Sequence, residues 1–273
     1  MTDRLHELVS SLLYEGYALY PYTPGATKNA TPTPFGIVYP PTYAAECDGA
    51  FDHARLECVA LAPPGAELTA ALHYLKPGSS RDEACAERVT LGPAALGERT
   101  SVEFAHGRLT LRSEPMTAAP DSEQFLVRCC VHNTAAVAPG SDRAAALARS
   151  LISTHTVVEI SAGRFMSPLE AGRESVNTWP VLATPSDDAI LGAAIVLPDH
   201  PQISDASHGN LFDNTEIEEA LVLHVHAMTD SERGQARQDP VVAEMLQRTL
   251  ALSPEEIIGL HSGLRSDSTR AGR

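Results

Sequence analysis

Aromatic residues make up only 5% of this 273-residue chain, and charged residues only 20%. No apolar run approaches the roughly 18 residues that a bilayer-spanning helix needs. The N-terminal stretch carries acidic residues and no apolar segment, so it does not resemble a secretory signal. The five cysteines include no C-x-x-C pair, so the usual spacing of zinc ribbons, iron–sulfur sites and dithiol redox pairs is missing. We therefore expect free thiols in a reducing compartment.

The formal net charge of the chain is −15. A charge of this sign repels nucleic-acid backbones and anionic membrane surfaces, so neither is expected as a partner. It suits a soluble cytoplasmic protein. Hydrophobic residues make up 43% of the chain, which is enough to build a folded core. The 20 prolines and 18 glycines separate short segments, a pattern that favours strands and loops over long helices.

The first 43 residues combine a short helix with a segment rich in tyrosine and proline. Within 3–14, apolar residues recur at the helical spacing i, i+3, i+4, i+7. The prolines that follow predict an extended, turn-rich segment, because proline removes a hydrogen-bond donor and fixes φ. Tyrosines at this density either line a core or dock a partner. Those of the segment are Tyr14, Tyr17, Tyr20, Tyr22, Tyr39 and Tyr43.

Short β-strands separated by Gly and Pro clusters are predicted from residue 48 to residue 138. Their regular spacing indicates an antiparallel sandwich or a small barrel. The segment 67–74 also fits a helical turn. Cys129 and Cys130 are adjacent in one of these strands and would point to opposite faces, which argues against joint metal ligation. The expected strands are 54–62, 67–74, 87–91, 100–104, 108–113 and 125–132.

The composition shifts at Pro139-Gly140. Ser141 or Asp142 can cap a helix that runs to about residue 150. Trp179, the only tryptophan, is expected as a buried anchor. Further on, a capping box and two capping residues followed by proline mark three helix starts. The remaining expected elements are strands at 151–160 and 190–197, a helical turn within 170–176, and helices at about 230–237, 240–251 and 254–264.

These patterns predict an α+β protein. Its body is a β-rich antiparallel sandwich or barrel-like structure, with a short N-terminal helix and C-terminal helices. The best domain boundary lies at Pro139-Gly140. It separates a β-rich region over 1–138 from an α+β region over 139–264, and a single domain is the alternative. Residues 265–273 lack apolar bulk and are predicted to be a disordered tail.

The stretch 199–226, where His, Asp and Glu residues crowd together beside a plausible strand, holds the candidate metal ligands. In a strand over 221–226, His224 and His226 would share one face, with Cα atoms about 6–7 Å apart. Imidazole pairs of this geometry bind transition metals. The competing interpretation takes the histidines as ordinary polar residues and the acidic group as a solvated strand edge. A third metal ligand could come from Asp213, Glu216, Glu218, His200 or His208.

The motifs of several common enzyme classes are absent from the sequence. There is no nucleophile elbow, phosphate-binding loop, dinucleotide fingerprint or H-E-x-x-H pair. Nothing in the sequence arranges Cys129 or Cys130 with a histidine such as His132 for thiol catalysis. We therefore predict no catalytic residue and favour a binding role over an enzyme. No cofactor is expected, and the alternative is a transition metal at His224 and His226.

Three parts of the chain carry a family resemblance: LYEGYALYPY at 13–22 with Lys28-Asn29 and Phe35-Gly36, NTWPVL at 177–182, and LPDHPQI at 197–203 with GNLFDNTEIEE at 209–219. Together they are similar to a family of bacterial proteins encoded near oxygen-tolerant, uptake-type nickel–iron hydrogenase genes. The similarity spans residues 8 to about 250. The family pattern has residues other than histidine where this chain has His208, His224 and His226, which argues against a metal site.

The resemblance implies an accessory role, either in assembling the hydrogenase or as an associated component of its complex. Hydrogenase subunits or maturation proteins are then the expected partners. A metal-dependent enzyme or metal carrier built on His224 and His226 remains the alternative. The candidate docking residues are Tyr14, Tyr17, Tyr20, Tyr22, Lys28 and Phe35 in the tyrosine-rich segment, and Phe212, Asp213 and Glu216 in the 199–219 loop.

Overall fold

The computed structural model describes residues 36–77, 84–116 and 123–201, and near the ends residues 5, 8–10, 12–13, 233, 247 and 249–253. The chain divides into two compact units. One comprises Met1–Val9 and Pro34–Pro201, and the other Ser10–Thr33 and Gln202–Arg273. The long described stretches all belong to the first unit, which holds the β-structure discussed below.

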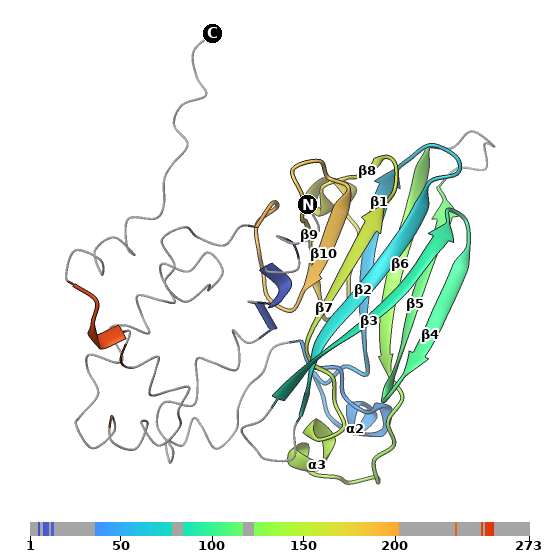
Figure 1. The fold of residues 1–273 in the computed structure, drawn as a ribbon. Coiled ribbons are helices and arrows are strands. Elements are labelled where there is room, and N and C mark those ends of the chain that lie inside the picture. Colours follow the sequence, from blue (N-terminus) through green and yellow to red (C-terminus); the bar gives the residue numbers. More distant parts are fainter. Residues whose placement is uncertain are drawn as a thin grey trace. The chain divides into compact units, whose positions relative to one another are not determined.

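Ten strands in the described residues form two five-stranded antiparallel sheets that pack face to face (Figure 1). The first sheet has the order β4 (Arg99–Phe104), β5 (Gly107–Pro115), β6 (Gln124–Asn133), β1 (His53–Leu61) and β8 (Arg164–Phe165). The second has the order β3 (Ala84–Ala95), β2 (Glu67–Pro77), β7 (Ile152–Ile160), β10 (Ala189–Ala193) and β9 (Trp179–Leu182). The prediction of a β-rich antiparallel sandwich is confirmed.

Each of the six strands expected between residues 54 and 132 is present. Their order within the sheets was not predicted from the sequence. The ambiguous segment 67–74 is part of β2, a strand and not a helical turn. Along the described strands, the chain passes from one sheet to the other five times, between β1 and β2, β3 and β4, β6 and β7, β7 and β8, and β8 and β9. Strands from before and after Pro139-Gly140 pair directly, β1 with β8 and β2 with β7.

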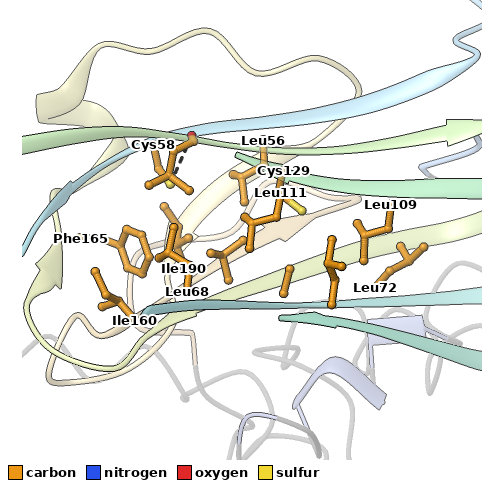
Figure 2. Close-up of a cluster of buried hydrophobic side chains, with 14 of the residues drawn as sticks. Leu56, Cys58, Leu68, Leu72, Leu109, Leu111, Cys129, Ile160, Phe165 and Ile190 are labelled. Atoms are coloured by element: carbon orange, nitrogen blue, oxygen red, sulfur yellow. Dashed lines mark hydrogen bonds between the residues drawn. The ribbon is translucent and has the colours of Figure 1, made fainter. Parts of the chain in front are cut away.

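The core lies between the two sheets and consists of the inward-facing residues of their strands. Phe165 is 1% exposed although its strand, β8, is only two residues long. Complete burial of a side chain of this size contributes about 1.5–3 kcal/mol. A one-residue slip of any of these strands would turn its apolar set outward, so burial also fixes the register. Figure 2 shows the core side chains Leu56, Cys58, Leu68, Leu72, Leu109, Leu111, Cys129, Ile160, Phe165 and Ile190.

Gly163, in the turn between β7 and β8, is required where it stands. Its φ is +105°, a region that side-chain-bearing residues rarely adopt. A Cβ at this position would lie 2.8 Å from Cα of Ala62 and closer still to the backbone oxygen of Leu61. Since backbone atoms cannot move aside like the end of a flexible side chain, only glycine brings the chain from β7 to β8 by this route.

The two sheets differ in how their outer faces are buried. In the second sheet, side chains that point away from the core are also buried, among them Leu75, Val157 and Leu191, each at most 1% exposed. In the first sheet, β1 begins with partly exposed and buried residues in alternation, and in β4 every second side chain is exposed. The first sheet therefore offers one open, polar face.

Within the described residues of 36–201 the structure has three short helices: α2 (Pro41–Glu46) before β1, α3 (Arg143–Leu147) between β6 and β7, and α4 (Pro168–Ala171) between β8 and β9. The expected cap of α3 is confirmed, because the Asp142 carboxylate accepts a hydrogen bond from the Ala145 amide at 2.8 Å. The tyrosine- and proline-rich segment was expected to be extended and turn-rich, and its end instead forms the start of the helix α2. Pro41 occupies the first helical position, where its fixed φ and missing N–H cost nothing.

Residues near the ends agree with the predicted helices where the structure describes them. Arg233, Gln247, Thr249 and Leu250 are helical. At the N-terminus the described apolar residues are helical and buried: Leu5, Leu8, Val9, Leu12 and Leu13. The helical turn expected within 170–176 instead forms as α4, which ends at Gly172 with a left-handed φ of 57°. The strand expected over 190–197 is β10 and ends at Ala193.

Trp179 is not the buried anchor that the sequence suggested, since 54% of the residue is exposed. It begins β9, the edge strand of the second sheet, and pairs with Ala193. An edge strand has a neighbour on one side only, so a bulky side chain at its first residue is left partly uncovered. The interpretation of Trp179 as a core residue is therefore wrong.

Its exposure gives a direct spectroscopic prediction. The chain has one tryptophan, so intrinsic indole fluorescence reports this side chain alone. We expect long-wavelength emission that acrylamide quenches efficiently in the folded protein, and little change in either property on unfolding. Emission at short wavelength that resists acrylamide would contradict the exposed position.

Candidate functional site

The residues that the sequence singled out for docking or metal binding lie outside the described residues. They are Tyr14, Tyr17, Tyr20, Tyr22, Lys28, Phe35, Phe212, Asp213, Glu216, His224 and His226. The alternative ligands Glu218 and His208 lie outside them too. Tyr39 and Tyr43, from the same tyrosine-rich segment, are described. Their rings pack against each other with centroids 5.0 Å apart, in a small apolar cluster with Ala146 of α3.

The described start of the 199–219 loop is fastened to the edge strand β9. The Asp199 carboxylate accepts hydrogen bonds from the Leu182 amide at 2.9 Å and the Ser167 hydroxyl at 2.7 Å. The His200 amide donates to the Leu182 carbonyl at 2.7 Å. The His200 ring is 2.7 Å from an Asp187 carboxylate oxygen. His200 was a possible metal ligand, and here its Nε2 is engaged with this carboxylate.

Two buried histidines lie opposite each other on the outer side of the second sheet. His73 of β2 and His155 of β7 are cross-strand partners, 6% and 1% exposed. Ser153 precedes them in β7 with a left-handed φ of 50°, beside a shift in the pairing register between β2 and β7. Such bulges redirect side chains and often lie near functional sites, so this cluster is a candidate active site.

The hydrogen bonds of His155 argue against a serine–histidine catalytic pair. The Ala194 amide lies 3.3 Å from Nδ1 of His155. A backbone amide can only donate, so Nδ1 must accept and the proton of the neutral ring is on Nε2. Nε2 lies 3.3 Å from the Ser153 hydroxyl and therefore donates to it. A base that activates a serine must accept the hydroxyl proton, and His155 has the opposite polarity.

Burial keeps His155 in this neutral form. Desolvation, aided by the nearby His73, lowers the pKa of His155 to about 3. The ring thus stays neutral at physiological pH and serves as a fixed link between β7 and the chain after β10. We conclude that this cluster stabilises the fold.

The open face of the first sheet carries the most unusual collection of charges in the described residues. Directly opposite residues in antiparallel strands share a face, so the pairing register defines its rows. One row, from β4 to β1, consists of Arg99, Arg112, Arg128 and Glu57, and the next consists of Ser101, Thr110, Cys130 and Arg55. We call this surface the arginine face; its charged members are Arg55, Arg99, Arg108, Arg112, Arg128, Arg164, Glu57, Glu103 and Glu114.

Ion pairs organise the centre of the arginine face. Arg128 lies between two carboxylates, with Nε 2.7 Å from Glu57 and Nη1 2.7 Å from Glu114. These hydrogen bonds, that of Glu57 first, raise the pKa of Arg128. Arg55 approaches Glu57 at 3.4 Å, and Arg112 approaches Glu114 at 3.5 Å. Two glutamates therefore form ion pairs with three arginines, and Arg128 makes the two shortest of these contacts.

The other two arginines are left incompletely bonded. The Nε atoms of Arg55 and Arg112 are buried, and neither has a hydrogen-bond partner among the described residues. A buried donor without an acceptor costs about 1–3 kcal/mol. The Nε atoms themselves are closed to solvent, but the side chains of Arg55 and Arg112 are 36% and 40% exposed, so an outside anion can reach the remainder of each side chain.

The thiols next to this surface are not activated. Burial is the largest influence on Cys130 and raises its pKa, although Arg55, Arg112 and Arg128 act in the opposite direction. Burial also raises the pKa of Cys58 and Cys129, which lie in the core. Cys129 and Cys130 point to opposite faces of β6, as predicted. The described cysteines form no disulfide, and Cys85 is exposed.

A pair of stacked histidines forms the end of the arginine face. The rings of His53 and His132 are 5.3 Å apart between centroids, and Asp52 contacts Nδ1 of His53 at 2.7 Å. Burial, with a smaller contribution from His53, lowers the pKa of His132. His132 also lies beside Arg108 in the register. The two rings therefore extend the surface, and the Asp52 carboxylate lies beside them.

The arginine face was missed at the sequence level, although a signal for it exists. Arginine, threonine and glutamate alternate with leucine and serine over 108–114, and the polar residues recur with period two. This pattern places the polar residues on one face of the strand. It does not say which strands lie side by side, and the arginines meet only through the pairing of β5 with β4 and β6.

Within the described part of the chain, no helix is long and apolar enough to cross a membrane. Three or more metal-ligating side chains do not come together anywhere in these residues. Comparison with known proteins gave no family model that matches the chain and no curated protein that matches it significantly.

Proposed function

We propose that this protein is a non-catalytic accessory or interaction protein of a nickel–iron hydrogenase system, active in assembly of the hydrogenase or as a component of its complex. The resemblance over residues 8 to about 250 supports the choice of partner. A cytoplasmic location is part of the same proposal. The direction of the hydrogen bonds around His155 supports a binding role, because the one buried serine–histidine contact among the described residues is oriented against catalysis.

The observation that carries the proposal is the exposure of Trp179. It belongs to the NTWPVL segment at 177–182, one of the three parts that carry the resemblance. Tryptophan is among the residues most enriched at the energetic centres of protein interfaces. Val196 is 71% exposed and lies three residues beyond Ala193, the cross-strand partner of Trp179. Trp179 and Val196 are both exposed large apolar side chains of the described residues.

The edge strand itself favours side-chain docking over strand addition. Pro180 follows Trp179 in β9 and has no N–H to offer a new strand. A partner at this edge would therefore be recognised through Trp179 and its apolar neighbours.

The test is an affinity pull-down of the tagged protein from its native cells, with mass spectrometry of partners and metal analysis. We expect hydrogenase subunits or maturation proteins with the native chain. Recovery should fall about tenfold or more for Trp179→Ala, because hot-spot truncations cost at least about 2 kcal/mol. Phe51→Ala removes another exposed aromatic residue, 42% exposed, and should leave recovery unchanged.

Two results would contradict the proposal. Equal recovery of the same proteins with Trp179→Ala would remove the docking role of this residue. Stoichiometric metal with no hydrogenase partner would replace the accessory role with the metal-dependent alternative at His224 and His226, to be checked by a double alanine variant.

A further inference from the structure

The arginine face reverses the charge balance of the chain. The whole sequence has 20 cationic and 35 acidic residues, and 18 of the cations are arginine. The arginine face has six arginines and three glutamates. A solvated surface of this protein would be expected to follow the acidic balance of the whole. The local excess of arginine therefore calls for a binding explanation.

The excess is concentrated on three arginines that the glutamates do not fully pair. Arg99, at the end of its row on the edge strand β4, has no ion-pair partner among the described residues. Arg55 and Arg112 have only the longer contacts to Glu57 and Glu114, at 3.4 and 3.5 Å, and the buried Nε of each makes no hydrogen bond among the described residues. Arg128, with both short contacts, is satisfied within the protein.

The pairing register places Arg55 and Arg112 around a patch of small side chains. Arg55 is opposite Cys130, Cys130 is opposite Thr110, and Arg112 is two residues along β5 from Thr110. At the usual strand spacing and rise, the Cα atoms of the two arginines are about 12 Å apart. Side chains as long as arginine, extending from both ends of this span, can bind neighbouring groups above Thr110 and Cys130.

We propose that the arginine face binds a carboxylate-rich segment of a protein partner, with Arg55, Arg99 and Arg112 as the principal contacts. The planar guanidinium group fits a carboxylate with two parallel hydrogen bonds. Small phosphates are usually held in concave sites of backbone N–H groups, whereas the inner strands of this sheet use theirs in the ladder. A net charge of −15 opposes binding to long nucleic acids.

The proposal rests on the proposed function in assuming a protein partner, and it adds the surface and the chemistry of recognition. The proposed partner and the proposed binding surface can be disproved independently of each other. Pull-down of hydrogenase proteins tests the identity of the partner, whereas the experiment below uses purified protein and a defined peptide.

The probe is a fluorescein-labelled, glutamate-rich peptide, and binding to the full chain is measured by fluorescence anisotropy at low ionic strength. Arg55→Gln/Arg112→Gln is expected to weaken binding about tenfold or more, since two charge-assisted contacts are lost. The matched control, Arg149→Gln/Arg173→Gln, makes the same change in net charge at two exposed arginines elsewhere and should alter binding less than about twofold. Raising the salt concentration should weaken binding to the native chain.

Arg99→Gln keeps the test valid if the double variant is unstable, because this exposed residue has no ion pair to lose. This variant should bind the peptide more weakly than the native chain, and its thermal unfolding temperature should be unchanged. Equal losses for the face and control variants would mean that net charge alone attracts the peptide, and the proposal would be wrong. It would also be overturned if the native chain does not bind the peptide, if inorganic phosphate displaces it at low concentration, or if a labelled single-stranded DNA binds more tightly.

Discussion

Truncation of Phe165 to alanine is expected to lower the free energy of unfolding by about 3–5 kcal/mol, the usual cost of removing a buried aromatic ring. Phe165 is 1% exposed and fills the core from β8, a strand of two residues that pairs with the end of β1. So short a strand has little backbone pairing to hold it, and the ring is its main attachment to the sandwich. Chemical denaturation followed by circular dichroism measures the change.

Phe51→Ala is the matched control for this variant. Phe51 is 42% exposed, so the same substitution should cost less than about 1 kcal/mol. If Phe165→Ala had the same free energy of unfolding as the native chain, β8 would not anchor its end of the sandwich. The core assignment of Phe165 would then be wrong.

Acidification is expected to destabilise the protein through His155. Its pKa is about 3 in the folded protein, against an ordinary value of 6.5 that applies to the unfolded chain. Between these two pH values, His155 is therefore protonated in the unfolded chain and neutral in the folded protein. The contribution of the neutral ring is fully present above pH 6.5 and is lost as the pH falls from 6.5 toward 3. The loss from this residue at pH 4.5 is about 2–3 kcal/mol.

His155→Gln removes this titration and keeps a polar side chain at the site. The variant should be less stable than the native chain at neutral pH, because the bonds to Ala194 and Ser153 are disturbed. Its stability should nevertheless fall less between pH 7 and pH 4.5, by about 2–3 kcal/mol. Urea denaturation of both proteins at the two pH values gives the difference. An equal fall in stability in both proteins would show that His155 can be protonated in the folded state, either in place or after local opening.

The two proposed surfaces are of different kinds. Trp179 presents apolar area at the edge of the second sheet, and the arginine face presents fixed charge on the open side of the first. Apolar anchors commonly supply much of the affinity of an interface, while complementary charges contribute to association rate and partner choice. A partner with an apolar pocket and an acidic segment would satisfy both.

Period-two patterning explains why the strands were predictable. In β6, apolar Val127 and Val131 alternate with polar Arg128 and His132, and this alternation is visible without any structure. The cap of α3 was predictable because it is also local in sequence: the Asp142 carboxylate bonds to an amide three residues away. Trp179 was misplaced because its burial depends on whether β9 lies at an edge, and strand order is a property of the folded sheet.

The sequence by itself determined the β-rich antiparallel class, most of its strands and the net charge of −15. All of these depend on local spacing or on composition. Only the tertiary structure decided which strands are neighbours, and with them the ladder of Arg99, Arg112 and Arg128, the pairing of His73 with His155, and the exposure of Trp179. Such contacts join residues from distant parts of the chain, and they form only when strand pairing brings those parts together.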